Sequence, residues 1–167
     1  MGANQRAQIV MSDDEIVQFV EQSRTCTVAT QSPNGSVHLV AMWYAVLDGE
    51  IWFETKAKSQ KVANLRRNPN ITVLIEDGHT YDALRGVSFE GRAEIVEDPA
   101  HLDRVGISVW ERYNGEYTEA LKPLVDQMMH KRIAVRVLTT RTRSWDHRKL
   151  GLPAMPLAGS TAAYLQK

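Results

Sequence analysis

The side chains best suited to chemistry in this chain follow one strand-like run and open a short helix. Residues 51–55 read as a strand, the run breaks at 56–58, and a helix is predicted to begin at Ser59. A helix N-terminus offers unpaired backbone N–H groups and the positive end of a dipole. With the hydroxyls of Thr55 and Ser59 and the ammonium of Lys61, this segment predicts a phosphate-binding site. The alternative is an ordinary solvated helix start capped by Ser59, and the lack of a glycine-rich turn argues against a nucleotide P-loop.

A second group of candidate residues is aromatic. The run Ala41-Met42-Trp43-Tyr44 lies in the middle of a long predicted strand, and Trp145 stands at the far end of the last strand. Aromatic and thioether groups pack well on π systems, so these residues could form the wall of a site for a flat ring. Packing in a core or an interface is the alternative for Trp43 and Tyr44.

Spacing argues against several other chemistries. The five histidines share no helix face at ligand spacing and no HExxH motif occurs, so we expect no metal site. Ser144, Asp146 and His147 are neighbours near a strand end, where adjacent side chains point to opposite faces, so they do not predict a catalytic triad. The single Cys26 excludes an internal disulfide, and it is predicted to be a small buried hydrophobe rather than a reactive thiol.

The charge balance bears on possible partners. Twenty acidic and twenty basic side chains cancel, so we expect no general affinity for nucleic acid or for an anionic membrane. The bases gather at 56–67 and at 131–149, and this layout favours one anionic ligand over a polyanion. No apolar stretch approaches the roughly 18 residues that span a membrane, and residues 1–10 lack a signal-peptide core. These features predict a cytoplasmic protein.

Caps, turns and periodicity predict the elements that must position these residues. Ser12 and Glu15 form a capping box that begins a helix ending near Ser23. A period of two and flanking turn residues then predict most of the other elements as strands. Strands are predicted over 25–31, 37–47, 51–55, 71–75, 84–96 and 133–143, and helical stretches over 59–67, from Pro99, and over 118–129. Hairpins followed by a helical excursion and a returning strand favour an antiparallel barrel or curved sheet over a parallel α/β fold.

The length of 167 residues suits one domain, or a subunit that completes its core by dimerising. We expect residues 1–11 to be a flexible N-terminus and residues 12–150 to be the folded domain. Residues 151–167 contain two prolines, two glycines and no periodicity, so they are predicted to be either a disordered tail or an arm packed on a partner.

The order of the elements, with TKAKSQK at the end of the third strand and SW at the end of the last, resembles the pyridoxamine-phosphate-oxidase-like split β-barrel flavoproteins. The resemblance extends from about Ile16 to Arg148, and its most specific parts are 55–69 and 84–94. It is closest to the actinobacterial branch that binds the deazaflavin coenzyme F420, where a Lys followed by an NLRR-like helix is usual. Residues 64–69, NLRRNP, fit that pattern.

The resemblance implies a mainly β, antiparallel split barrel with peripheral helices, and a homodimer with two cofactor sites across the interface. By motif, Thr55, Ser59 and Lys61 would hold the cofactor phosphate, and Gln60 lies within the same motif. Ala41, Met42 and Trp43 would line the ring, partly through their backbone, while Trp145 would reach it from the other subunit. Lys56, Lys58 and Arg66 could meet the acidic tail of the deazaflavin.

The chain departs from the FMN oxidases of this family at several positions. Gln60 stands where they usually carry Arg, Gly86 stands where they carry Gln, and no Arg occurs near Leu39. The Arg-x-His pattern that binds pyridoxal phosphate is not reproduced, since His147-Arg148 has the opposite order. These differences lower the expectation of tight FMN binding and of pyridoxamine phosphate oxidation.

The sequence therefore predicts a cytoplasmic, homodimeric reductase that transfers a hydride from reduced F420 to a small organic acceptor, with no metal, nucleic-acid or membrane partner. No proton donor is assigned, although Tyr44 and His147 are titratable groups near the presumed ring. One alternative is an FMN-dependent oxidase or reductase. Another is a non-catalytic carrier of flavin, deazaflavin or haem, in which His79 or His147 could serve as an axial ligand.

Overall fold

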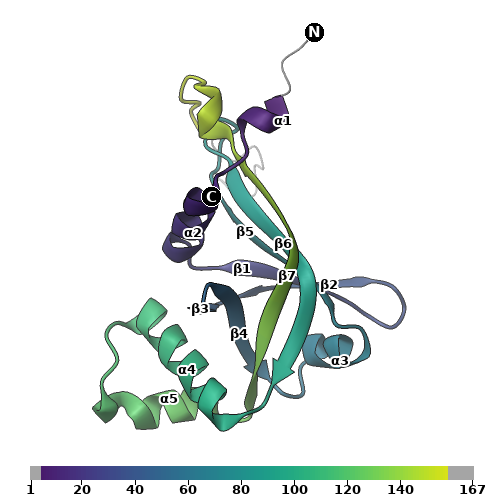
Figure 1. Cartoon of the computed structure of the whole chain (residues 1–167), viewed down its shortest axis with the longest axis vertical. Helices are drawn as coiled ribbons and strands as arrows, with labels where there is room; N and C mark the ends of the chain where they lie inside the picture. Colours follow the sequence, from purple (N-terminus) through teal and green to yellow (C-terminus); the bar gives the residue numbers. More distant parts are fainter. Residues whose placement is uncertain (1–4, 158–167) are drawn as a thin grey trace, which may run out of the picture.

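Seven antiparallel strands form one curled sheet in the order β2-β1-β5-β6-β7-β4-β3, seen here in a computed structural model that describes residues 5–157 (Figure 1). The fold is the mainly β, antiparallel split barrel with peripheral helices that the sequence predicts. The strands are β1 (Cys26–Gln31), β2 (Val37–Met42), β3 (Ala45–Leu47), β4 (Glu50–Lys56), β5 (Asn70–Asp77), β6 (Arg85–Val96) and β7 (Arg132–Asp146). The helices are α1 (Gln5–Gln8), α2 (Asp13–Gln22), α3 (Gln60–Arg67), α4 (Pro99–Asn114) and α5 (Lys122–Met129), with 3₁₀ turns η1 (Glu119–Leu121) and η2 (His147–Leu150).

Local signals position the helix starts as predicted. In α2, Ser12 accepts from the Glu15 backbone while the Glu15 carboxylate accepts from the Ser12 backbone, which completes the capping box. In α4, the Asp98 side chain caps the helix and Pro99 fills its first turn. These caps depend only on neighbouring residues, which is why the sequence predicts them well.

The strand predicted over 37–47 is divided in two, and this corrects the sequence-based expectation. β2 pairs with β1, whereas β3 pairs with β4, and Trp43 and Tyr44 form the corner between them. The Tyr44 side chain is fully buried, and its hydroxyl donates to the carbonyl of Val20 at 2.5 Å at the end of α2. This anchor directs the chain from one side of the barrel to the other.

The last strand is longer than predicted, because β7 continues to Asp146 and pairs with β6 from Ala134 to that end. A bulge between Glu90 and Gly91 interrupts this pairing. At Gly91 a Cβ would lie 2.1 Å from the carbonyl oxygen of Leu138, so the close approach of the two backbones requires glycine. The upper parts of β5, β6 and β7 thus extend beyond the barrel (Figure 1).

The core lies inside the curled sheet, and a helix packs at each end of it. Phe19 of α2 and Leu65 of α3 both belong to the main hydrophobic cluster, together with buried valines and isoleucines of β1, β5, β6 and β7. On the outer face, α4 covers β3, β4 and the lower part of β7 through a second cluster that includes Trp52, Val105 and Ala134. Among the described residues, no helix covers the rest of the outer face (Figure 1).

This uncovered outer face is apolar at its edge strand. On β2 the side chains of Val37 and Leu39 are each 63% exposed, and Ala41 is exposed beside them. By register they lie next to Gln31, Ala29 and Thr27 of β1, which point to the same side. The half of the sheet that α4 leaves open therefore presents hydrophobic side chains to solvent.

The segment before α2 contacts the extended part of the sheet. Residues 9–11 lie within the stretch expected to be flexible, yet the Ile9 carbonyl accepts from Asp146 N at 2.7 Å, and Met11 N donates to Ser144 Oγ at 3.0 Å. Residues 151–157 are exposed and contain no helix or strand, and residues 158–167 of the predicted arm or tail lie outside the described residues. No helix within 5–157 is long and apolar enough to cross a membrane.

Candidate functional site

The residues predicted to bind phosphate meet where β4 ends and α3 begins. Lys61 Nζ donates to Thr55 Oγ1 at 3.1 Å, and the Thr55 hydroxyl lies 3.3 Å from the Ser59 hydroxyl. Ser59 is the N-cap residue of α3, but its side chain accepts no hydrogen bond from the helix. The alternative of a simple serine cap is therefore wrong, and the N–H groups of the first turn lack a side-chain cap.

Lys61 is a buried cation with few partners. The residue is 8% exposed, and among the described residues its ammonium donates only to Thr55, although an ammonium has three donors. Burial lowers the pKa of Lys61 below that of a free lysine; Glu54 opposes this shift and Arg132 adds to it. Glu54 is already bonded to Arg132 at 2.5 Å. An anion beside Lys61 would use the remaining donors and stabilise the charged form.

Sequence reasoning missed the polar contacts that fix α3 against β1. Asn64, which is 1% exposed, donates to Thr30 Oγ1 at 3.1 Å and accepts from Gln60 Nε2 at 2.9 Å. Arg67 donates to the carbonyl of Gln31 at 2.6 Å. The only available signal was an asparagine between the two apolar residues that face the core, Val62 and Leu65. These bonds hold α3, and Lys61 with it, against β1.

The remaining cations near this cluster differ in availability. Lys56 and Lys58 are exposed and form no ion pair with any residue between 5 and 157. Arg66 instead pairs with Glu97 at 2.7 Å. Two of the three cations expected to meet an acidic tail are thus free to do so.

Most bases of the segment 131–149 are neutralised within the chain, which corrects the interpretation that this segment serves an anionic ligand. Four of these pairs join β7 and η2 to β4, β6 and α2, and the fifth joins η2 to the end of β7, so the bases do not form an open cationic patch. The five pairs are Arg132–Glu54, Arg136–Glu50, Arg143–Glu90, Arg148–Asp146 and Lys149–Glu15.

The predicted ring wall lies on the uncovered outer face, at its border with α4. Ala41 faces outward from β2, whereas the partly buried Met42 packs against the core, so Met42 can meet a ring only through its backbone. Trp43 follows at the corner with its side chain 50% exposed. Its indole stacks on Tyr113 of α4, with ring centroids 4.3 Å apart and planes within 6°.

The two residues considered as proton donors have other partners. The Tyr44 hydroxyl is buried against the end of α2, and burial raises its pKa above that of a free tyrosine. The ring of His147 is bonded through Nδ1 to the carbonyl of Tyr81 at 2.9 Å, so that nitrogen is not free for a ligand. Within residues 5–157 no group of three or more His, Cys, Asp or Glu side chains is arranged to hold a metal ion.

Trp145 lies on the same outer face, over Gly86 of the paired strand. The two residues are register partners, and a Cβ at Gly86 would lie 2.4 Å from Cζ2 of the indole. The space that a side chain at position 86 would fill is therefore taken by the tryptophan ring. This contact gives a structural reason for the glycine that the sequence carries in place of the glutamine of FMN oxidases.

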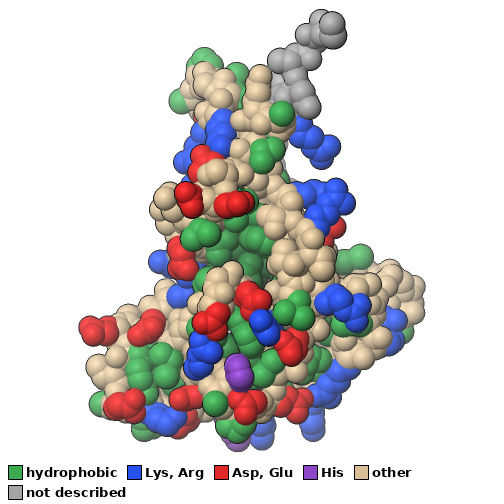
Figure 2. Space-filling model, in the orientation of Figure 1, with side chains coloured by type: hydrophobic (Ala, Val, Ile, Leu, Met, Phe, Trp, Pro, Cys, Tyr) green, Lys and Arg blue, Asp and Glu red, His purple; other side chains and the backbone are tan. Residues whose placement is uncertain are grey.

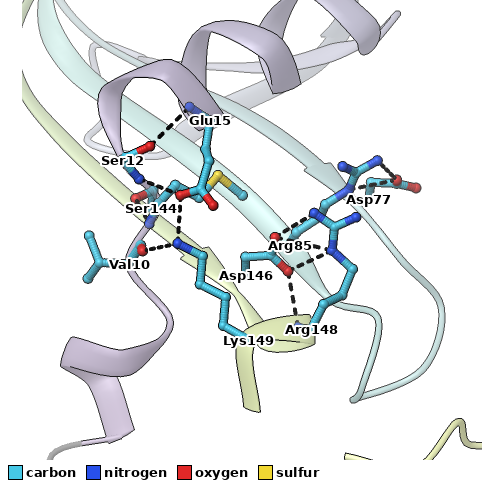
Figure 3. A network of polar contacts seen from close by, with 10 residues as sticks. Val10, Ser12, Glu15, Asp77, Arg85, Ser144, Asp146, Arg148 and Lys149 are labelled. Carbon is cyan, nitrogen blue, oxygen red and sulfur yellow. Dashed lines mark hydrogen bonds and ion pairs between the residues drawn. The ribbon is translucent and has the colours of Figure 1, made fainter. Parts of the chain in front are cut away.

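A polar network holds the strand end that carries Trp145 (Figure 3). On one side, Ser144 Oγ accepts from Met11 N at 3.0 Å. On the other, Asp146 is 4% exposed and accepts from Arg148 Nη2 at 2.5 Å, which keeps the pKa of this carboxyl below its usual range. Lys149 then donates to Glu15 at 2.6 Å and to the carbonyl of Val10 at 2.7 Å. Both neighbours of Trp145 are fixed, so the indole is directed to the outer face.

The two aromatic walls cannot serve one ring within a single chain. Ala41, Thr27, Leu74, Ser88 and Arg143 form a continuous row of register partners, and Trp145 follows two residues later. Four steps between strands of about 4.8 Å separate Ala41 from this end of β7 by roughly 19 Å. Curling increases the separation on the outer face. A site that uses both Ala41 and Trp145 therefore requires two copies of the chain.

A separate cavity of about 550 Å³ opens on the concave side, between α2 and the β3–β4 hairpin. Figure 2 shows hydrophobic side chains gathered in the middle of this face, with charged side chains around them. None of the predicted site residues lines the cavity. Its walls are Ile16, Val17, Val20, Glu21, Val46, Gly49, Glu50, Ile51, Phe89, Val137, Thr139 and Thr142.

Residues 12–146 match the pyridoxamine 5'-phosphate oxidase family, a span that includes the whole sheet and both candidate walls. The chain belongs to this family. Membership confirms the resemblance based on the TKAKSQK and SW motifs. No functionally curated protein matches the chain.

Solved structures place this family member among proteins of several kinds. It is 68% identical to the conserved hypothetical protein Rv2991 from Mycobacterium tuberculosis, with a TM-score of 0.91 over 94% of this chain and 98% of that one. A protein described as an F420 reductase is 29% identical, with a TM-score of 0.56 over 75% of this chain and 93% of that one. The haem storage protein HutZ from Vibrio cholerae shares the fold at 16% identity, with a TM-score of 0.64 over 80% of this chain and 96% of that one.

Proposed function

We propose that this protein is a homodimeric oxidoreductase that transfers a hydride from reduced coenzyme F420 to a small organic acceptor. The observation that carries the proposal is Lys61, a buried ammonium bonded only to Thr55 among the described residues, at an uncapped helix N-terminus. The similarity to a protein described as an F420 reductase supports the choice of cofactor. A cytoplasmic location, predicted from the sequence, remains part of the proposal.

The charge of the phosphate site favours a phosphodiester over a phosphomonoester. Position 60 supplies a glutamine that bonds to Asn64, so Lys61 is the only cation of the motif that is buried at the site. One lysine and a helix dipole equivalent to about half a charge match the single negative charge of the F420 diester. The monoester of FMN carries close to two negative charges and would be less fully neutralised.

The uncovered outer face supports the proposed dimer. Val37 and Leu39 leave apolar surface exposed on β2, and a second copy docked there would remove it from water. The separation of about 19 Å between Ala41 and the end of β7 means that Trp145 can approach the ring wall only from the partner. A dimer would thus both bury the surface and complete two sites.

Each residue then has a stated task, while bound F420 supplies the hydride chemistry. Thr55, Ser59 and Lys61 would hold the phosphate. The backbone of residues 41–43 would support the ring, and Trp145 of the second copy would exclude water from its other side. Lys56 and Lys58, free of ion pairs within residues 5–157, would meet the acidic tail.

The second candidate is an FMN-dependent oxidase or reductase. The same Thr55–Ser59–Lys61 cluster favours it in part, since two hydroxyls and an ammonium can also hold a monoester. The tryptophan over Gly86 and the glutamine at position 60 count against it.

Titrating the purified protein side by side with F420 and with FMN, followed by fluorescence, tests the proposal. We expect F420 to bind at micromolar concentration or below and FMN to bind more weakly. The opposite preference would assign the protein to the FMN class. Failure to bind either cofactor would refute the proposed reductase.

A Lys61→Ala variant tests the phosphate assignment itself. We expect F420 affinity to fall by about 1.5–3 kcal/mol, the range for hydrogen bonds to charged groups. Lys122→Ala is the control, because it removes the same charge from a lysine of α5 that pairs with Asp103 and Asp126 and takes no part in the proposed site. Equal effects of the two variants would show that Lys61 acts only through its charge.

A further inference from the structure

One ring nitrogen of His38, on β2, is buried without a partner. This Nδ1 is shielded from solvent and has no hydrogen-bond partner among residues 5–157. Two other buried side-chain nitrogens in the described part of the chain share this condition, but both lie at α4: Trp52 packs under the helix, and Arg112 belongs to it. A neutral imidazole has one donor and one acceptor nitrogen, and burying either one unpaired costs free energy. The His38 ring therefore needs an explanation that packing does not give.

His38 lies at the same end of the barrel as the first turn of α3. Alternation along β2 directs its ring inward, as it directs Val40 and Met42, which pack against the core. Its register partner is Thr30 of β1, and directly opposed residues of antiparallel strands have neighbouring side chains. Thr30 Oγ1 accepts from Asn64 of α3 at 3.1 Å. The imidazole thus lies beside the contact between β1 and α3.

The polar side chains at this contact are engaged with one another. The Asn64 amide donates to Thr30 Oγ1 and to Ser32 Oγ, so it has no hydrogen left for His38. Its oxygen accepts from Gln60 Nε2 at 2.9 Å. Gln60 is the first residue of α3, and the N-terminus of this helix is the proposed phosphate site. A polar network therefore leads from the neighbour of His38 to that site without using the imidazole.

β2 is an edge strand, so the sheet is open on the side away from β1. Within residues 5–157 β2 pairs with β1 alone. His38 precedes Ala41 by three residues, which places it about 10 Å along the strand from the proposed ring wall. In F420 a ribityl chain joins the ring to the phosphate. A cofactor with its ring at residues 41–43 and its phosphate at the start of α3 would have this chain between the two, on the side of His38.

We propose that His38 is a further cofactor-binding residue, whose Nδ1 forms a hydrogen bond with a hydroxyl group of the ribityl chain. The inference rests on the proposed function for the positions of the ring and the phosphate. A hydroxyl both donates and accepts, so it can pair with Nδ1 whichever ring nitrogen carries the proton. FMN contains the same ribityl chain, so this contact does not depend on which of the two cofactors binds.

Fluorescence titration with three deazaflavins tests which part of the cofactor His38 contacts. The first is F420, the second keeps the ribityl chain but lacks the phosphate, and the third carries a methyl group in place of the ribityl chain. We expect His38→Leu to weaken binding of the first two by the same factor, about tenfold, as for the loss of one hydrogen bond. The methyl compound should bind wild type and His38→Leu equally.

Two polar replacements test the assignment to Nδ1. The amide of His38→Asn is short enough to place a polar atom where Nδ1 lies, so this variant should keep most of the F420 affinity. The longer amide of His38→Gln reaches the position of Nε2 instead and should lose about as much as His38→Leu. His101→Leu is the matched control, because it removes an imidazole of α4 that pairs with Asp98 and takes no part in the proposed site.

Stability of the cofactor-free protein separates binding from a structural role. His38→Leu removes a buried polar atom that has no partner within residues 5–157, so the midpoint of urea unfolding should stay the same or rise. Saturating F420 should then raise the midpoint of wild type more than that of the variant. If His38→Leu does not fold, the comparison of His38→Asn with His38→Gln still decides the question.

Each outcome bears on one proposal or the other. F420 affinity that is equal in wild type and His38→Leu would overturn the inference and leave the proposed reductase standing. A loss for F420 without a loss for the phosphate-free ribityl compound would overturn the assignment to the ribityl chain. A protein that prefers FMN, and loses FMN affinity in His38→Leu, would support the role of His38 and refute the F420-dependent reductase. Binding of neither cofactor would refute both.

Discussion

Replacing Gly86 by alanine tests whether the tryptophan ring occupies the space above position 86. The added Cβ would lie 2.4, 2.8 and 3.0 Å from Cζ2, Cε2 and Cη2 of Trp145, well inside ordinary contact distance. The indole must therefore move, and overpacking of this kind costs about 1–3 kcal/mol. Alanine also relieves the entropic disadvantage of glycine in a strand by about 0.5–1 kcal/mol. The net expectation is that Gly86→Ala lowers the free energy of unfolding by about 0.5–2 kcal/mol.

The same substitution should change sign when the tryptophan is absent. The three atoms nearest to a Cβ at position 86 all belong to the Trp145 indole, and a Trp145→Ala background removes them. In that background Gly86→Ala should therefore be neutral or stabilising by about 0.5–1 kcal/mol. The coupling in this double-mutant cycle is then about 1–3 kcal/mol.

Urea unfolding followed by far-ultraviolet circular dichroism is the suitable assay, because a fluorescence signal would change with Trp145 itself. All four proteins are compared at one protein concentration, since the proposed dimer would make stability depend on concentration. Equal destabilisation by Gly86→Ala in both backgrounds would refute the reasoning, because the cost would then come from the backbone and not from the indole.

Two further predictions concern buried groups. The Asp146 carboxylate, whose pKa Arg148 lowers, contributes stability that is complete above the pKa of an unfolded aspartate and is lost as the pH falls through the lower folded value. Asp146→Asn should therefore cost about 1–2 kcal/mol in urea unfolding near neutral pH, with the gap to wild type closing in acid. Asp77→Asn is the control, and it should lower the free energy of unfolding by less, because the Asp77 side chain is 54% exposed. A stability difference between Asp146→Asn and wild type that persists in acid would contradict the role given to the Asp146 carboxylate. The Cys26 thiol is the second buried group: the residue is 2% exposed, and burial raises its pKa to about 12. Iodoacetamide near neutral pH should therefore leave Cys26 unmodified in the folded protein and modify it in concentrated urea. Mass spectrometry measures the extent of modification in each state. Modification at equal rates in both states would show that the thiol is not buried.

Much of the fold follows from local sequence. The capping box of Ser12 and Glu15 and the alternation of Val87 and Phe89 with polar residues in β6 are set by neighbouring side chains, and the structure contains both. The hydrogen-bonded cluster of Thr55, Ser59 and Lys61 also lies within a few residues of chain, and the structure brings its members together. Short range is why these features could be predicted.

The divided strand shows where local reasoning fails. The run from 37 to 47 is rich in residues that favour strands, and nothing in its pattern marks a corner at Trp43 and Tyr44. The corner exists because the Tyr44 hydroxyl reaches the carbonyl of Val20, a residue on a different element. Likewise, the bases at 131–149 suggest an anion site only until their acidic partners on other strands are known.

The sequence by itself determined the family, the antiparallel barrel and the hydrogen-bonded cluster of Thr55, Ser59 and Lys61, because each is expressed in short motifs or in periodicity. Only the tertiary structure decided that Trp145 lies over Gly86, that Tyr113 supports Trp43, and that Ala41 lies too far from Trp145 to share a ring within one chain. These relations depend on which strands pair and on where α4 packs. Contacts between residues distant in sequence arise from the packing of whole elements, and no local spacing encodes them.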